Sequence, residues 1–459
     1  MDVDNAPGVG GLTENYEDIK NIEFGKIKTH DNFSYSFEYF VRPINFSDSK
    51  GPHTFEFPAD PTHFTDLTSL TLEGKIKVKN KAGNATAIFN TLAGGVNTRC
   101  DISTVNNIIH SQYSVINYKI QNVEMGDSTS YSYPYKAYFE NALSHDELCK
   151  KEQLKLHGYM ADTTKKFNDV TNVIADNDNG GYSSRAEIYC KDNHVKFRIK
   201  LRIDLSTVDQ YLQPNVSLRF HLTRADDSFC LLSNSQTLKW GIELQDLQMS
   251  VRKLTPKPKF LSKFYTALEK NPLVYDIDRN IVKFYSRPTG TLDLSVYNLF
   301  SSEKLPTLIF VALVKEKALN GALSENPFHF HHHNTKEIYL DINGVPFPIN
   351  KYKLDIGAME YQHMYARFLE TIGVLNKNTS IGISSEEWLE DYFMIGFDLN
   401  FDQCYNFHRH EYKSGVINLN WKLDSGLTEG VSIVIYASYR DVFAINLNGE
   451  VDNTYSIRT

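Results

Sequence analysis

Alternation of apolar and polar residues is the feature that most restricts how this chain can fold. One run has an apolar residue at every second position except Gly74, namely Leu70, Leu72, Ile76 and Val78. Successive side chains of a strand point to opposite faces of a sheet, so this spacing predicts a strand with one buried face. Aromatic residues, which favour half-buried pleated surfaces, make up 13% of the chain. The sequence therefore predicts an all-β protein.

The predicted strands fall into two blocks. Residues 1–20 have the glycine-rich, acidic composition of a flexible N-terminal arm. We expect a first block at 21–254 and a second at 259–451, joined at 255–258, where two prolines cannot continue a central strand. Residues 452–459 then form a C-terminal tail. Because β-sandwiches often reach about 200 residues, two of them fit the 459 residues of this chain.

A helical pattern interrupts the first block at 133–148. Pro134 can occupy a first helical turn, where its missing N–H is not needed. Apolar residues then recur at intervals of three and four: Tyr135, Tyr138, Phe139, Ala142 and Leu143. An amphipathic surface helix is the ordinary interpretation of such a segment. So many aromatic residues on one face nevertheless predict that this face packs against a β-sandwich or a neighbouring subunit.

Two further helices are predicted from similar patterns. Ser144 and Glu147 have the spacing of a capping box, which predicts a second helix over 148–159. In the second block, residues 360–375 carry an apolar stripe at helical spacing that ends near Gly373. The predicted organisation is therefore two sandwiches, each with a helical insertion.

Four segments carry a resemblance to one protein family: YPYKAYFENALS from Tyr133, LQDLQMSVRKLTPKP at 244–258, and the segments 305–348 and 431–449. In sequence and in order they are similar to parts of the double jelly-roll major capsid proteins of the Polinton/Maverick and adintovirus branch. The chain departs from the family's pattern at 204–216 and at 331–333. The fold that the resemblance implies is all-β with short helical insertions, arranged as two tandem jelly-roll β-sandwiches.

The function implied by the resemblance is structural. Three copies would form a pseudo-hexagonal homotrimeric capsomer, and capsomers would tile an icosahedral virus-like particle together with a minor or penton capsid protein. The implied location is the virion capsid, after synthesis inside the host cell. The alternative is a carbohydrate- or protein-binding β-sandwich recognition module, because jelly rolls also occur in lectins and fold alone does not fix function.

Composition sets limits on other classes of protein. The five cysteines are odd in number, scattered and without CxxC spacing, which favours reduced thiols in an intracellular protein. The N-terminus lacks the basic start and apolar core of a secretory signal. The longest apolar run, 305–314, is about half of the ~20 residues that span a membrane. A net charge of −8 without a block of Lys or Arg argues against direct sequence-specific nucleic-acid binding.

An EF-hand-like loop is the first candidate metal site. Asp176, Asp178 and Glu187 stand at positions 1, 3 and 12, with Gly181 at position 6. Position 5 is a glycine instead of a ligand, however, and the residues from Ala186 onward alternate like a strand where an EF-hand has a helix. A solvated loop that opens a hairpin is therefore predicted.

A histidine run is the second candidate. In an extended chain, His329, His331 and His333 would project to one face and could hold zinc. An open strand rarely completes a tetrahedral site, so a surface or interface strand is predicted here, and His408 and His410 have the same interpretation. The sequence contains no GxSxG elbow, HExxH or Walker motif. We therefore predict no catalytic residue, no metal and no cofactor.

Overall fold

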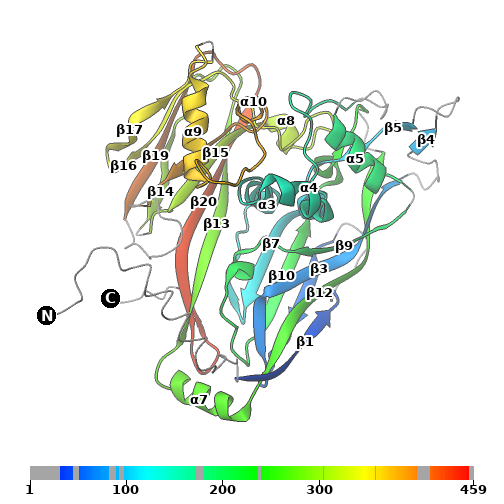
Figure 1. The fold of residues 1–459 in the computed structure, drawn as a ribbon, viewed down its shortest axis with the longest axis vertical. Coiled ribbons are helices and arrows are strands. Elements are labelled where there is room, and N and C mark those ends of the chain that lie inside the picture. The colour runs from blue at the N-terminus through cyan, green and yellow to red at the C-terminus, as the bar shows by residue number, and fades with distance from the viewer. Residues whose placement is uncertain are drawn as a thin grey trace.

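The structure is a computed structural model that describes residues 32–44, 51–81, 89–91, 98–170, 179–191, 193–235, 239–302, 304–356, 358–400 and 414–453. The predicted N-terminal arm, most of the tail, and both His408 and His410 lie outside these residues. The described residues form two β-sandwiches that stand side by side, with helices between them (Figure 1).

The first sandwich consists of two four-stranded antiparallel sheets. One has the order β1-β12-β3-β9, with strands Phe33–Val41, Trp240–Pro256, Phe64–Asn80 and Val195–Lys200. The other has the order β2-β10-β7-β8, with strands His53–Phe57, Leu218–Arg224, Tyr113–Ile120 and Val123–Glu124. Two short two-stranded sheets accompany them: β4 (Phe89–Thr91) with β5 (Thr98–Cys100), and β6 (Ser103–Thr104) with β11 (Leu231–Leu232).

The second sandwich is built in the same way. One sheet has the order β13-β20-β15-β18, with strands Leu273–Arg287, Val431–Ile445, Leu308–Lys315 and Met394–Asp398, and β21 (Val451–Asp452) pairs with β20. The other has the order β14-β19-β16-β17, with strands Val296–Ser302, Gly415–Leu423, Thr335–Ile342 and Val345–Lys353.

The two sandwiches share the same strand order. In the first, β1, β2, β3, β7, β8, β9, β10 and β12 are taken as strands 1 to 8, and in the second β13 to β20. The two sheets then read 1-8-3-6 and 2-7-4-5 in each sandwich. Eight strands wound so that the last lies beside the first form a jelly roll. The prediction of two tandem jelly rolls is confirmed, and the internal repeat is one of topology, without a residue-level repeat in the sequence.

The core of each jelly roll follows the alternation in the sequence. The four apolar residues on either side of Gly74 are all buried in β3, as predicted. Gly74 allows close packing here, because a Cβ atom would lie 2.6 Å from the Leu247 side chain and 3.0 Å from that of Phe197, so these side chains would have to shift. The predicted buried strand within 305–314 is β15.

Helices fill the connection between the fifth and sixth strands of both jelly rolls. In the first these are α3 (Ser132–Leu143), α4 (Glu147–Glu152), η1 (Leu154–His157) and α5 (Gly180–Tyr189), and in the second α9 (Tyr361–Thr371) and α10 (Ser385–Glu390). Shorter helices are α2 (Ile108–Ser111), η3 (Asp204–Thr207), α6 (Asp227–Cys230) and α8 (Glu316–Leu319). Both predicted helical insertions are confirmed. The predicted capping box at Ser144 is wrong, because the Asp146 carboxylate accepts the N–H of Cys149 (2.7 Å) and caps α4 instead.

Helix α7 (Pro258–Leu268) connects the two jelly rolls and lies at the bottom of Figure 1. Strand β12 continues to Pro256, which still pairs with Phe33 of β1. Pro258 then begins α7, where its ring suits the first turn. Among the described helices, none has both the length and the apolar character needed to cross a membrane.

Candidate interdomain junction and assembly surfaces

Helix α3 is enclosed between the two jelly rolls (Figure 1). Eleven of its twelve residues are buried, and Glu140 is partly exposed. The expectation of an amphipathic surface helix is therefore wrong, while the prediction that the aromatic face packs against a β-sandwich is confirmed. The reason is that the second jelly roll covers the side of α3 that the first leaves open.

Aromatic rings of α3 pack on the second jelly roll. Tyr138 stacks on Phe328 with ring centroids 4.3 Å apart, and Phe139 stacks on Tyr436 of β20 at 5.6 Å. The chain just before Phe328 also offers a backbone carbonyl that accepts the hydroxyl hydrogen bond of Tyr135, 2.9 Å away. Aromatic pairs of this kind contribute about 0.5–1.5 kcal/mol each beyond the area they bury. Rings on one helix therefore bind the two jelly rolls together.

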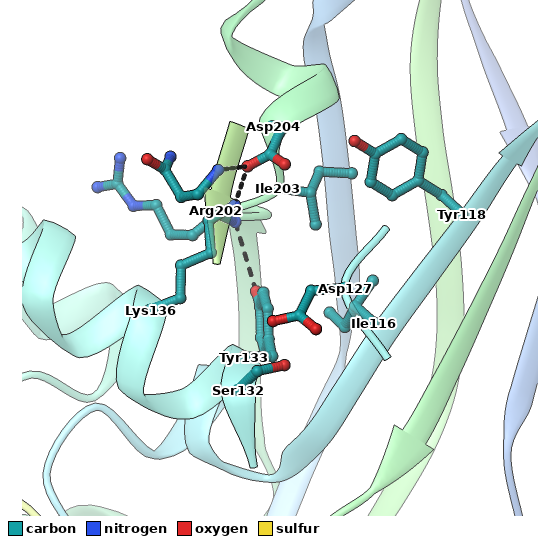
Figure 2. Close-up of a pocket in the computed structure, with 10 residues that line it drawn as sticks. Ile116, Tyr118, Asp127, Ser132, Tyr133, Lys136, Arg202, Ile203 and Asp204 are labelled. Atoms are coloured by element: carbon teal, nitrogen blue, oxygen red, sulfur yellow. Dashed lines mark hydrogen bonds and ion pairs between the residues drawn. The ribbon is translucent and has the colours of Figure 1, made fainter. Parts of the chain in front are cut away.

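A buried ionic cluster lies beside these rings. Lys136 of α3 forms an ion pair with Asp204 of η3, and Figure 2 shows the lysine side chain reaching from the helix toward that carboxylate. Asp204 Oδ1 also accepts the backbone N–H of Asn280 in β13 (3.2 Å). The Asn280 side chain donates to Glu140 Oε1 (3.4 Å), and this oxygen lies 4.0 Å from Lys136 Nζ. The cluster thus joins α3 and η3 to the second jelly roll.

Burial controls the protonation of this cluster. Desolvation raises the pKa of the Glu140 carboxyl, which favours its neutral form. Burial by itself lowers the pKa of Lys136, but the carboxylates of Asp204 and Glu140 outweigh it and raise that pKa overall. Beside the cluster is a cavity of about 20 Å³, enough for one water molecule. The arrangement is therefore a lysine–aspartate pair next to a carboxyl group whose pKa is raised by burial.

A second buried ion pair joins Arg185 of α5 to Asp162, at 2.7 Å, and both side chains are fully buried. The other N–H groups of Arg185 donate to the carbonyls of Thr104 (2.7 Å) and Met160 (2.6 Å). Asp162 Oδ2 accepts from the side-chain amide of Asn326, 3.1 Å away in the second jelly roll. Hydrogen bonds of this number offset the desolvation of a buried pair and fix the position of α5.

Helix α5 replaces a strand that the sequence predicted. Asn179 caps the helix by accepting a backbone N–H of its first turn, and Arg185 anchors the middle of the helix in the junction. The predicted loop followed by a hairpin is therefore wrong at 180–189. Of the acidic positions of the EF-hand-like pattern, Asp176 and Asp178 lie outside the described residues, and Glu187 is exposed on α5.

The histidine run bends where an extended strand was expected. His333 has a φ of 43° and the residue after it a φ of 54°, which are left-handed conformations of a turn. His329, His331 and His333 therefore do not form a strand with one shared face, and that prediction is wrong. The structure instead brings together possible ligand atoms of His331, His332 and Glu390, all within 4.8 Å of one another.

The hydrogen bonds of these rings oppose metal binding. Nδ1 of His331 accepts the N–H of His333 (3.0 Å), and Nδ1 of His332 accepts the N–H of Asn334 (3.0 Å). A neutral imidazole that accepts at one nitrogen carries its proton on the other. Neither ring can then give a lone pair to a cation unless a backbone hydrogen bond breaks. Burial also lowers the pKa of His331 to about 3 and of His332 to about 4, which keeps both rings neutral.

Sequence reasoning found the aromatic face of α3 but missed its polar residues. Lys136 and Glu140 are four residues apart on a helix, a spacing that ordinarily indicates a solvent-exposed pair. The sequence did contain one indication that they are buried, because both stand among aromatic residues of one short helix. Asp204, Asp162 and Arg185 gave no such signal, because their partners lie far away in the sequence.

Exposed apolar side chains lie on edge strands of both jelly rolls. Tyr35 of β1 is 60% exposed, and on β17 Val345 and Ile349 are 60% and 82% exposed. Two prolines in β17 remove N–H donors from that edge, which limits backbone pairing with another strand.

Sequence comparisons relate the chain to an uncharacterised nematode protein. No protein-family model matches the chain. An uncharacterised protein of Caenorhabditis elegans is 23% identical over 352 residues, which cover 74% of this chain and 79% of that protein.

Solved structures match the chain over nearly its whole length. A chain of the Sputnik virophage superposes with a TM-score of 0.58 at 13% identity, covering 95% of this chain and 92% of the other. The mavirus major capsid protein gives 0.54 at 10% identity, with coverage of 100% and 96%. The Faustovirus major capsid protein gives 0.53 at 8% identity, with coverage of 94% of each chain. The strand order and these likenesses together show that this chain has the double jelly-roll fold of viral major capsid proteins.

Proposed function

We propose that this chain is a major capsid protein that assembles as a homotrimer. The observation that carries the proposal is the fusion of two jelly rolls of identical strand order, side by side, through the buried helix α3. Two such units per chain give six around a three-fold axis, so a trimer has a pseudo-hexagonal outline that tiles a shell. The neighbours named as major capsid proteins, matched almost end to end, support this function.

We further propose that, among major capsid proteins, this chain belongs to the Polinton/Maverick and adintovirus branch. The four segments similar to that family and the mavirus neighbour support it. The protein would be made in the host cell and reside in the virion capsid. A six-sided capsomer does not fit the five-fold vertices of an icosahedron, so a minor or penton protein is its expected partner. The function of the chain is then structural: it buries subunit surface in contacts within the shell and does not turn over a substrate.

Light scattering coupled to size-exclusion chromatography tests the proposal. We expect a mass about three times the 52.6 kDa of one chain, stable on dilution, because obligate interfaces commonly bury more than about 2,000 Å². Negative-stain images of the same peak are expected to show six-lobed particles. A monomer at all concentrations would contradict the proposal, and a monomer that binds glycans would favour the recognition-module alternative.

A further inference from the structure

The ionic cluster of α3 holds one lysine and two carboxyl groups away from solvent. The side chains of Lys136 and Asp204 are at most 10% exposed, and that of Glu140 is 18% exposed. Ile116 and Tyr118 line the same cavity, as Figure 2 shows. An ion pair in such surroundings has lost most of its hydration, and the attraction between its two partners must offset that cost.

The positions of these groups suit a condensation reaction. Lys136 Nζ contacts the carboxylate of Asp204, so a nucleophile and an acyl group are already adjacent. The N–H of Asn280 donates to Asp204 Oδ1 and is placed to stabilise negative charge there. Glu140 Oε1 lies 4.0 Å from Nζ, so a small rotation of its side chain brings it within hydrogen-bond reach.

We propose that Lys136 and Asp204 condense to an intramolecular isopeptide bond, with Glu140 as the proton carrier. In the first step Lys136 Nζ gives up a proton and Asp204 Oδ2 gains one, with Glu140 passing the proton because Nζ itself contacts Oδ1. The ion pair thereby becomes an amine and a carboxylic acid. The Nζ lone pair then attacks Cγ, and the carbonyl electron pair moves onto Oδ1, which accepts the N–H of Asn280.

Glu140 completes the reaction. One of its oxygens takes a proton from Nζ, while its own acidic proton passes to Oδ2. The Cγ–Oδ2 bond breaks, the carbonyl re-forms at Oδ1, and one water molecule leaves. Glu140 is regenerated in its protonated form, which its raised pKa favours. The net change is lysine ammonium plus aspartate carboxylate to amide plus water, so no oxidant, metal or co-substrate is needed.

The ion pair between Lys253 and Asp60 is the matched internal control. Its atoms lie 2.9 Å apart and Lys253 is buried like Lys136, but the Asp60 side chain is 24% exposed where that of Asp204 is 7% exposed. The remaining described partners of Asp60 are Thr62 and His63, not a second carboxylic acid. Burial raises the pKa of Asp60, but hydrogen bonds from Lys253 and these two residues lower it overall, well below its ordinary value. This aspartate stays ionised and unreactive.

The bond would close a loop between positions 68 residues apart and fix α3 to η3. Closing such a loop restricts the unfolded chain and so stabilises the folded one. The inference does not rest on the proposed function, because a trimer without the bond leaves that function standing, and a linked monomer leaves the bond standing.

Mass spectrometry of the purified full-length protein tests the proposal. We expect the intact mass to be lower than the sequence mass by one water molecule. After digestion, we expect a branched peptide that joins Lys136 to Asp204, with loss of trypsin cleavage after Lys136. Lys253 and Asp60 are expected in separate, unmodified peptides of the same digest. A folded protein with its full sequence mass and a linear Lys136 peptide overturns the proposal.

Two variants separate the roles of the residues. Lys136→Arg keeps the ion pair but supplies no nucleophilic amine, so we expect its full sequence mass. Glu140→Gln keeps the shape of the side chain but carries no acidic proton, and we expect loss of most of the branched peptide. A Glu140→Gln protein that links as completely as the parent overturns the assignment of Glu140. If either variant fails to fold, the mass of the parent protein still decides the proposal.

Discussion

Phe139 shows how a single residue connects the two jelly rolls. Its ring is fully buried, lies on a helix inserted in the first jelly roll, and stacks on Tyr436 in the second. A fully buried aromatic side chain contributes through the apolar area it removes from water and through close packing on every side. Stability of the junction therefore depends on a few large rings.

Phe139→Ala is expected to lower the free energy of unfolding by about 3–5 kcal/mol, because the truncation leaves a cavity between the two jelly rolls. Urea denaturation followed by tryptophan fluorescence measures the change. Leu156→Ala is the control, since Leu156 on η1 is 67% exposed and its truncation is expected to change stability by less than about 0.5 kcal/mol. Equal stability of the two variants would show that the ring of Phe139 does not support the junction.

Buried histidines make the first jelly roll sensitive to acid. His110 Nε2 lies 3.2 Å from His157 Nδ1, and His145 Nε2 lies 3.0 Å from the guanidinium of Arg202. Burial, reinforced by the charge of Arg202, lowers the pKa of His145 and of His157 to about 4. Burial also lowers the pKa of His110 well below its ordinary value.

The pH dependence follows from these shifts. An unfolded imidazole has a pKa of about 6.5. Between pH 6.5 and 4 the unfolded chain binds more protons than the folded one, so stability is full above pH 6.5 and is lost as pH falls through this window. We expect the melting temperature to drop from pH 7 to pH 4.5, and to drop less steeply in His157→Gln. Identical slopes for parent and variant would show that His157 is not held neutral by the fold.

Elements that lie at the edges of sheets are where we expect this subunit to meet its copies in the proposed capsomer. Strand β17 carries the most exposed large apolar residue of the described chain, Ile349, and its prolines discourage backbone pairing. A second copy of this chain is the partner that fits this surface, because the proposed capsomer places a neighbouring copy beside each subunit, with different surfaces of the two copies in contact.

Ile349→Lys is therefore expected to leave the subunit folded but to weaken assembly, since it places a charge in an apolar contact. The fraction of trimer in light scattering and the yield of particles measure the effect. Asn350→Lys is the matched control, because it adds the same charge at the neighbouring exposed position without removing an apolar side chain. If Ile349→Lys assembles as well as the control, β17 is not part of a contact between copies.

We expect the whole molecule to unfold as one body, because its two jelly rolls share helix α3 and two buried ion-pair clusters. Domains joined by a small, polar interface unfold separately, whereas these share a core of stacked rings. Scanning calorimetry is expected to show one cooperative transition, and Phe139→Ala is expected to move that transition without splitting it. Two resolved transitions in the parent protein would show that the jelly rolls are energetically independent.

Much of the fold could be predicted from the sequence, because periodicity is a local property. The alternation around Gly74 gave β3 and its buried face, and the apolar stripe at 360–375 gave α9. Local sequence patterns predicted secondary structure wrongly where two patterns overlapped in one segment. Residues 186–189 alternate like a strand, yet the Asn179 cap and the buried Arg185 hold them in α5. Asp146 likewise competed with Ser144 as a cap and prevailed.

The sequence by itself determined the class of fold, the two blocks of strands and the apolar face of α3, since each depends on residues near one another in the chain. Only the tertiary structure decided that the whole of α3 is buried, that the histidine run turns, and that Lys136 meets Asp204. Burial and ion pairing depend on segments that come together from distant parts of the chain, such as η3 and β13, which meet beside α3. Their positions follow from the winding of both jelly rolls, which no local pattern encodes.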